Sequence, residues 1–120
     1  MKEIKSQNWG TFCDRLNEFE RGAMVDILWI DRATKAEKTI AHNAEFEKIS
    51  FGQHDGCNDQ FLVRAGGESE TRHEIVEPMY VGLRETGEDG NFNGVAIEAE
   101  EGTTILTFQP VIHSGWVKGL

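Results

Sequence analysis

The sequence predicts an α+β domain in which one N-terminal helix packs on a curled, mainly antiparallel sheet or partial β-barrel. Apolar residues recur with a helical period only near the start of the chain, over residues 6–21. The rest contains short alternating segments separated by turn residues, the clearest of which are the two at 93–108. One helix followed by roughly six to eight short strands is typical of an α+β domain.

Residues 93–108 predict a β-hairpin whose first strand has one apolar face and one acidic face. Gly102 lies in the turn, and we expect it to supply the positive φ that a tight hairpin needs. In the first strand Val95, Ile97 and Ala99 alternate with Ala96, Glu98 and Glu100. In the second, Thr104, Leu106 and Phe108 alternate with Thr103, Ile105 and Thr107.

Residues 6–21 are the only strong helical segment, because their apolar residues follow a 3.6-residue period. Ser6 or Asn8 is suited to cap its start, and Gly22 to end it. We expect the apolar stripe to pack on the sheet. It consists of Trp9, Phe12, Cys13, Leu16 and Phe19.

Strands are expected to follow the helix in order. Residues 23–32 carry apolar side chains on both faces, which is typical of a central strand. A turn at 33–35 should lead to a weaker strand at 36–43. Residues 46–52 follow as a strand or as a short helical turn before a strand, and their composition favours the strand. Residues 52–60 have the composition of a loop.

The second half continues with short strands. Proline cannot donate to a central ladder, so Pro78 should mark a strand edge or break. The expected elements are a strand at 61–65, a turn at 66–69, a strand at 72–77, a strand at 79–84 and a polar loop at 85–93.

The length of 120 residues predicts a single domain over 1–109 and a C-terminal tail over 110–120. The tail has too little periodicity for an element to be assigned. It is either loose or docks Val111, Ile112 and Trp116 on a neighbour.

The net charge of −9 bears on possible partners. Phosphate backbones are bound by clusters of Lys and Arg, and the chain contains none, so we expect no nucleic-acid binding. An acidic surface favours solubility, or alternatively a basic partner. No apolar run approaches the ~20 residues that span a bilayer, and the N-terminus lacks a secretion signal. We therefore expect a cytoplasmic protein without membrane contact, in which Cys13 and Cys57 are free thiols.

Several landmarks resemble a known family. They are Trp9-x-x-Phe12, His73-x-Ile75-x-x-Pro78, Val81-x-Leu83-x-Glu85 and the segment Ile-Glu-Ala-Glu-Glu-Gly-Thr-Thr-Ile-Leu-Thr-Phe at 97–108. Over residues 9–108 the chain resembles a bacterial domain family of about this length whose function is unknown. The resemblance implies no activity, cofactor or catalytic residue.

The densest group of potentially reactive side chains is His54-Asp55-Gly56-Cys57-Asn58-Asp59. Imidazole, thiolate and carboxylate suit a transition metal. However, the sequence has no CxxC or HxxxH spacing, and Asp, Asn and Gly are also common in turns. We therefore favour an ordinary loop over a metal site.

Other combinations are equally weak. A triad of Cys13 or Cys57 with His73 and Glu74 is possible by residue type, but no nucleophile turn supports it. We interpret the histidines as structural and expect the carboxylates to face water. The residues concerned are His42, His73 and His113, and the pairs Glu74 with Glu77 and Glu98 with Glu100.

The sequence thus assigns no catalytic, cofactor-binding or metal-binding residue, and no cofactor. It favours a non-enzymatic interaction or accessory domain with a protein partner, or with a second copy bound through the tail. The alternative is a small-molecule-binding domain with an apolar cavity inside the curled sheet. That cavity would be lined by residues such as Trp29, Phe46, Phe61 and Tyr80. A hydrolytic or metal-dependent enzyme using residues 54–59 ranks third.

Overall fold

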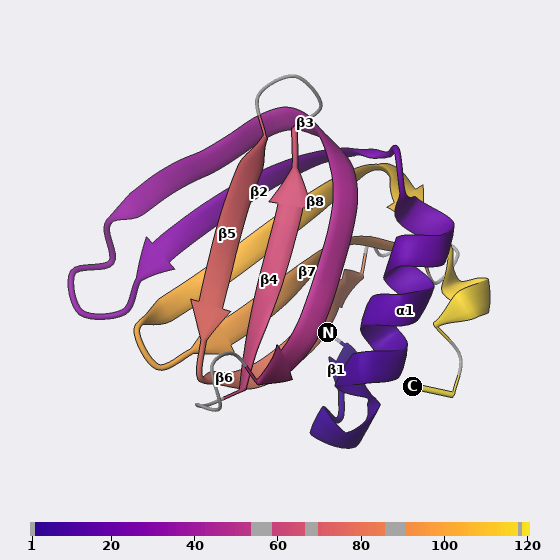
Figure 1. The fold of residues 1–120 in the computed structure, drawn as a ribbon, viewed down its shortest axis with the longest axis horizontal. Helices are drawn as coiled ribbons and strands as arrows, with labels where there is room; N and C mark the ends of the chain where they lie inside the picture. Colours follow the sequence, from indigo (N-terminus) through magenta and orange to yellow (C-terminus); the bar gives the residue numbers. More distant parts are fainter. Residues whose placement is uncertain (1, 54–58, 67–69, 86–90, 118) are drawn as a thin grey trace.

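The structure, a computed structural model, describes residues 2–53, 59–66, 70–85, 91–117 and 119–120. It confirms the predicted fold class. Helix α1 packs on an antiparallel sheet that, in the described part of the chain, has eight strands and is not closed (Figure 1). The strands lie in the order β1-β6-β7-β8-β2-β3-β4-β5.

The elements follow one another closely along the chain. They are β1 (Lys2–Ile4), η1 (Ser6–Asn8), α1 (Trp9–Glu20), β2 (Met24–Asp31), β3 (Glu37–Gln53), β4 (Asp59–Ala65), β5 (Thr71–Val76), β6 (Pro78–Glu85), β7 (Phe92–Ala99), β8 (Gly102–Ile112) and η2 (Ser114–Trp116).

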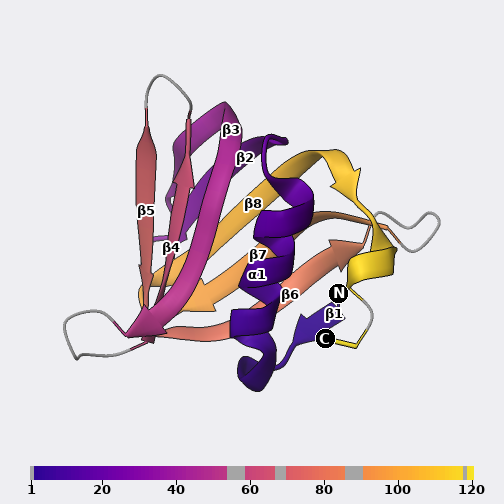
Figure 2. The ribbon, with the colours of Figure 1, turned by 45° about the vertical axis from the view of Figure 1, so that its right-hand side comes forward.

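Strand β3 determines the shape of the sheet. Its first half pairs with β2 and its second half pairs with β4. Asn43 lies near the end of the half that pairs with β2, at a register shift opposite Asp26. It has a φ of 53°, a conformation that asparagine adopts more readily than most residues. The Asn43 N–H donates to the Asp26 carboxylate at 2.6 Å. The second half of β3 therefore lies with β4 and β5 over the rest of the sheet (Figure 2).

The expectation of separate strands at 36–43 and 46–52 was wrong, because β3 spans both. Apolar alternation is interrupted around Asn43, and such an interruption resembles a strand end in the sequence. In the structure it is a bend within a continuous strand.

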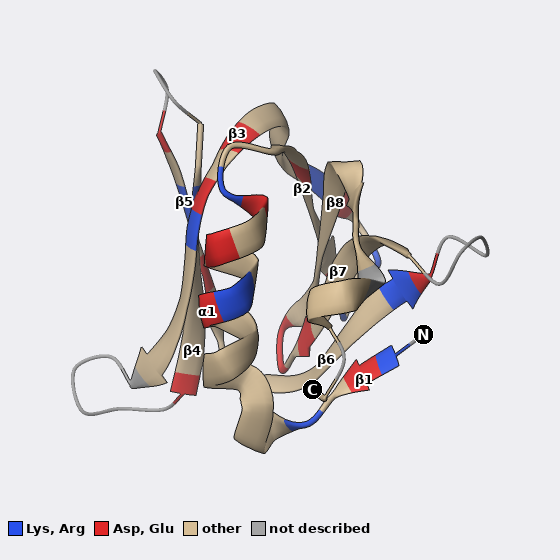
Figure 3. Ribbon diagram, turned by 90° about the vertical axis from the view of Figure 1, so that its right-hand side faces the viewer, with Lys and Arg blue, Asp and Glu red and all other residues tan. Residues whose placement is uncertain are grey.

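Helix α1 fills the opening where β3 leaves β2 (Figure 3). The Asn17 Nδ2 donates to the Ile49 carbonyl at 2.8 Å, and the Ile49 N–H donates to Asn17 Oδ1 at 2.7 Å. These are the two bonds that a neighbouring strand would make with Ile49. The helix therefore replaces a strand along the second half of β3.

The apolar stripe of α1 is buried except at one position. Trp9 and Leu16 lie in the core, and the Trp9 indole donates to the Ile4 carbonyl at 2.9 Å. Phe19, contrary to expectation, is outside the core and 55% exposed, and it stacks on Trp116 of the C-terminal segment. Asn8 is the N-cap residue, but its side chain makes no capping bond.

The hairpin is confirmed, since β7 and β8 pair in antiparallel register on either side of the turn. The side chains of Val95, Ile97, Ala99, Thr104, Leu106 and Phe108 are buried. The role expected for Gly102 was wrong. Only three described glycines, Gly22, Gly66 and Gly119, have a positive φ. Gly22 ends the helix region with a φ of 89°, as predicted.

The C-terminal segment packs on its own domain. Strand β8 continues to Ile112 through a cis Gln109–Pro110 bond, and both Ile112 and Val117 are buried. The Arg15 Nη1 donates to the Trp116 carbonyl at 2.9 Å, which joins this segment to α1. Pro78 begins β6 directly after β5, so it marks a strand break as predicted.

Replacing Asn17 with alanine should destabilise the protein by about 1–3 kcal/mol, because the partly buried N–H and carbonyl of Ile49 would lose their partners. Urea denaturation measures the change. The matched control is Asn8→Ala, which removes a side chain that makes no capping bond to α1. Equal stabilities of Asn17→Ala and Asn8→Ala would show that the helix does not replace a strand.

Candidate functional site at the free edge of strand β5

A pocket of about 330 Å³ opens at one end of the curled sheet. This volume lies at the lower end of the range for small-ligand pockets. Strands β2, β3 and β5 and the turn between β7 and β8 form its walls. The lining residues are Trp29, Lys38, Ile40, His73, Glu74, Val76, Ala99 and Glu101.

His73 joins the two layers of the sheet at this pocket. Its Nε2 lies 2.8 Å from the Thr104 hydroxyl, which comes from β8 on the opposite layer. The imidazole also contacts Trp29, with ring centroids 5.9 Å apart and planes at 64°. Burial lowers the pKa of His73, and the Glu74 carboxylate opposes this only in part. His73 is therefore neutral at pH 7 and holds β5 in position, as a structural histidine was expected to do.

The contact between His73 and Thr104 does not form a usable nucleophile–base pair. Thr104 has no exposed surface, so a substrate has no access to its hydroxyl. Cys13 lies on α1, and burial, with a contribution from Asp14, raises the pKa of its thiol to about 12. It stays protonated and unreactive. The triad considered from the sequence is not assembled around Cys13, and Cys57 lies outside the described residues.

Gly102 makes room for the aromatic wall of the pocket. A Cβ at this position would lie 2.3 Å from the Ile30 carbonyl oxygen and 2.6 Å from Cζ2 of Trp29. Both distances are shorter than van der Waals contact. Glycine is therefore required for close approach between the hairpin turn and β2, which is the physical reason that replaces the expected positive φ.

Hydrogen bonds fix the rim above Trp29. The Arg32 Nη2 donates to the Ala99 carbonyl at 2.7 Å, and the Arg32 N–H donates to the Glu101 carbonyl at 2.9 Å. The Asp31 carboxylate accepts from the N–H groups of Thr34 and Ala33, and these bonds lower its pKa. The two turns beside the pocket are thus held together.

Strand β5 is an unpaired edge beside this pocket. It pairs with β4 on one side, and no described strand pairs with it on the other. The Glu77 N–H donates to the Asp59 carbonyl, and hydrogen-bonded pairs alternate along an antiparallel ladder. His73 and Ile75 therefore direct their backbone groups toward β4. Those of Arg72, Glu74 and Val76 face outward.

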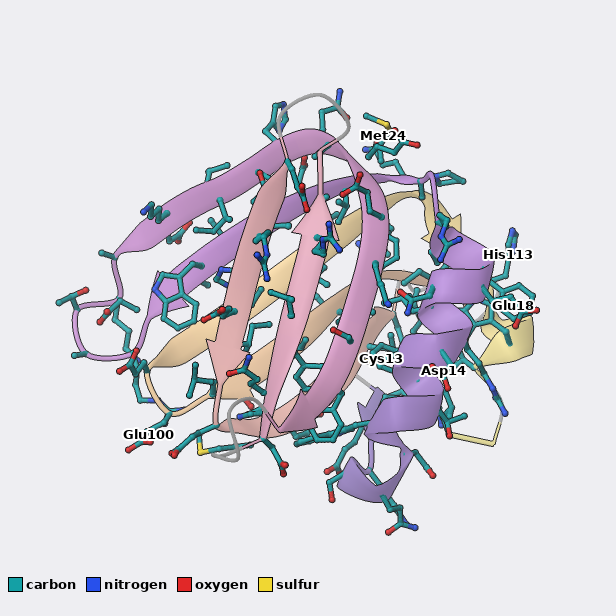
Figure 4. The ribbon with its side chains drawn as sticks, viewed as in Figure 1. Cys13, Asp14, Glu18, Met24, Glu100 and His113 are labelled. Carbon is teal, nitrogen blue, oxygen red and sulfur yellow. The ribbon has the colours of Figure 1, made fainter. Side chains whose placement is uncertain are left out.

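Carboxylates gather near the same end of the sheet. Glu77 and Glu100 share a hydrogen bond that raises the pKa of Glu77. With Asp59 they line a neighbouring depression, and Figure 4 shows Glu100 at the end of the sheet opposite α1. The sequence suggested other pairs, Glu74 with Glu77 and Glu98 with Glu100, which are close in the sequence. The observed pair could not be predicted in this way, because only the fold shows which strand ends meet.

Other sequence expectations are resolved only in part. Residues 54–58 lie outside the described residues, and the described part of the chain contains no group of three or more potential metal ligands. His42 is exposed and lies 3.1 Å from the Asp26 carboxylate. No helix in the described ranges is long and apolar enough to cross a membrane.

The expected interior cavity does not form around its four proposed lining residues. Phe46 and Phe61 have no exposed surface. Their rings pack against Phe108 and Phe51 at centroid distances of 5.2 and 4.9 Å and so fill the space between the layers. Trp29 alone of the four lines the pocket beside β5.

A family model described as a family of unknown function, DUF5335, matches residues 1–112. This confirms the predicted resemblance to an uncharacterised family of about this length. No curated protein and no solved structure matches the chain.

Replacing Gly102 with alanine should destabilise the protein by about 1–3 kcal/mol, because the added methyl group would push against the backbone of Ile30 and the ring of Trp29. Thermal or urea unfolding measures the loss. The matched control is Gly10→Ala in α1, where an added Cβ meets nothing within 4 Å. That variant should be more stable by about 0.5–1 kcal/mol. A stable Gly102→Ala protein would contradict the close approach.

Proposed function

We propose that this chain, which belongs to the DUF5335 family, is a non-enzymatic protein-interaction domain that binds an extended, basic segment of a partner protein along the free edge of β5. The observation that carries this proposal is the position of the 330 Å³ pocket directly beside an unpaired strand edge. A segment added to such an edge gains main-chain hydrogen bonds from the strand and specificity from the adjacent pocket.

The backbone of β5 supplies the main-chain partners. The N–H and carbonyl groups of Arg72, Glu74 and Val76 face away from β4, so they are available to an added strand. The contact between His73 and Thr104 anchors β5 from its inner side. A partner segment would therefore meet an edge that is already ordered, which lowers the entropic cost of binding.

The pocket favours one apolar and several basic side chains. Trp29, Ile40 and Val76 form its apolar wall, and Val76 is 49% exposed. Glu74 and Glu101 line the same pocket, where Lys38 is the one positively charged side chain among the described lining residues. The whole chain has a net charge of −9. Complementary charge favours a basic partner and speeds encounter.

The same charges disfavour a second copy of the chain as the occupant. Along β5 itself Arg72 balances Glu74. At the pocket, however, Glu74 and Glu101 exceed Lys38, so two copies would bring together sites with the same charge excess, which is unfavourable across an interface. The self-association considered from the sequence also assigned contacts to the tail. In this structure Trp116 instead packs against Phe12 and Phe19 of its own helix.

We further propose that this interaction takes place in the bacterial cytoplasm. Cys13, a buried free thiol, is compatible with a reducing compartment.

Small-molecule binding is the second candidate function, now at the pocket beside β5 in place of the interior. The edge-to-face contact of Trp29 with the neutral His73 favours it, because an aromatic wall and an imidazole can hold a small planar ligand. The peptide proposal ranks first because it also employs the outward backbone groups of β5.

Selection from a displayed library of random ten-residue peptides tests the proposal. Enriched peptides should alternate Lys or Arg with β-branched or aromatic residues. Glu74→Pro should weaken their binding at least roughly tenfold, because proline removes the outward N–H and leaves the ladder with β4 intact. Isothermal titration measures the affinities.

Glu74→Thr is the matched control, since it loses the charge but keeps the N–H. It should weaken binding only a few-fold, as expected for a rim charge. Thermal unfolding confirms that both variants are folded. Enriched peptides that bind Glu74→Pro as tightly as the parent chain would overturn the proposal, as would the absence of any enrichment. Dimerisation through β5, seen by light scattering and abolished by Glu74→Pro, would identify a second copy as the occupant instead.

A further inference from the structure

A second pocket, of about 540 Å³, lies where the C-terminal segment meets the end of α1. Figure 1 shows this segment beside the helix, on the side of the molecule away from β5. It belongs neither to the β5 edge nor to the interior of the sheet. The lining residues are Phe19, Glu20, Pro110, Val111, His113, Gly115 and Trp116.

Two effects disfavour a negative charge on Glu20 in this pocket. Its exposed fraction is only 6%, and burial raises the pKa of its carboxyl group. It is also the last residue of α1, where the helix dipole disfavours negative charge. A buried carboxylate is costly unless a partner compensates for the lost water. A site that keeps such a group is a candidate for binding.

The neighbours of Glu20 compensate for this burial only in part. The Trp116 indole and the charge of His113 lower the pKa of Glu20, but by less than burial raises it. The Trp116 Nε1 lies close to the carboxylate without reaching good hydrogen-bond geometry, and it has no other partner among the described residues. Among the described residues, no Lys, Arg or His forms an ion pair with Glu20.

Aromatic rings form the wall beside this carboxylate. Phe19 and Trp116 stack with centroids 5.9 Å apart and planes only 8° from parallel. Phe12 supports the indole from the core side at 6.2 Å. Ring faces next to a buried carboxylate attract a cation through both the π system and the negative charge. Arg15 does not line the pocket, and it is held by the Trp116 carbonyl.

We propose that this pocket binds an organic cation, a primary ammonium or guanidinium group on an apolar stem, with Glu20 as counter-ion and the pair of Phe19 and Trp116 as its wall. The cation would compensate the buried carboxylate, and the stem would cover Val111 and the exposed face of Phe19. Three lining residues, His113, Gly115 and Trp116, follow the segment matched by the family model. The site is thus independent of the family match and of the proposed function at β5.

Titration of small cations into the ¹⁵N-labelled chain tests this inference. The probes are n-butylammonium and n-butylguanidinium, with neutral 1-butanol and anionic butyrate as matched controls. The cations should shift the Trp116 indole N–H resonance, which is identified by its absence in Trp116→Phe. The two controls should leave it in place or bind roughly tenfold more weakly, because they lack the charge-assisted bond to Glu20.

Glu20→Gln should weaken binding of both cations roughly tenfold or more. The matched control is Glu18→Gln, which removes an exposed glutamate from the same helix (Figure 4) and should change binding little. A doubly blocked lysine tripeptide distinguishes the source of the cation. If the tripeptide binds as well as n-butylammonium, the natural ligand is a cationic side chain of a protein. If n-butylammonium and n-butylguanidinium bind and the tripeptide does not, the natural ligand is a small organic cation. Equal binding of butylammonium and butanol, or equal effects of Glu20→Gln and Glu18→Gln, would overturn the inference.

Discussion

The bend of β3 at Asn43 is the constraint on which the rest of the structure depends. Two residues beyond this bend, after Glu45, β3 leaves β2, and from Phe46 onward it pairs with β4, so a single sheet covers both sides of the core. The second half of β3 thus has no bonds to β2, and α1 occupies the gap through the paired bonds between Asn17 and Ile49. The bend also carries β5 across to the opposite layer, where His73 can reach β8.

Both candidate sites follow from this curled but unclosed arrangement. A closed barrel would have no free edge, whereas here no described strand pairs with the outer edge of β5, which lies beside a pocket. On the side of the molecule away from β5, the C-terminal segment packs beside the end of α1, and Glu20 and Trp116 line the pocket formed there. In each place polar groups lack a full set of partners among the described residues, and such groups are what a ligand or a partner can satisfy.

The sequence predicted those parts of the fold that depend on local periodicity. The helix, the central strand and the hairpin each repeat their pattern over enough residues to be recognised. It failed where distant residues decide. The bend at Asn43 is held by a hydrogen bond to Asp26, 17 positions away in the sequence. The packing of α1 along β3 depends on the hydrogen bonds between Asn17 and Ile49, which are 32 positions apart. The sites were missed for the same reason, because nothing near Glu20 in the sequence indicates that it is buried.

Amide hydrogen exchange along β5, measured by NMR, tests whether the curled sheet is open at this strand. The N–H groups of His73 and Ile75 should be protected by their bonds to β4, whereas those of Glu74 and Val76 should exchange much faster. The Ile49 N–H should be protected as well, because Asn17 accepts from it. Uniform protection across β5 would mean that its edge is covered, and an unprotected Ile49 would mean that α1 does not replace a strand. Either result would contradict an open sheet curled by the bend in β3.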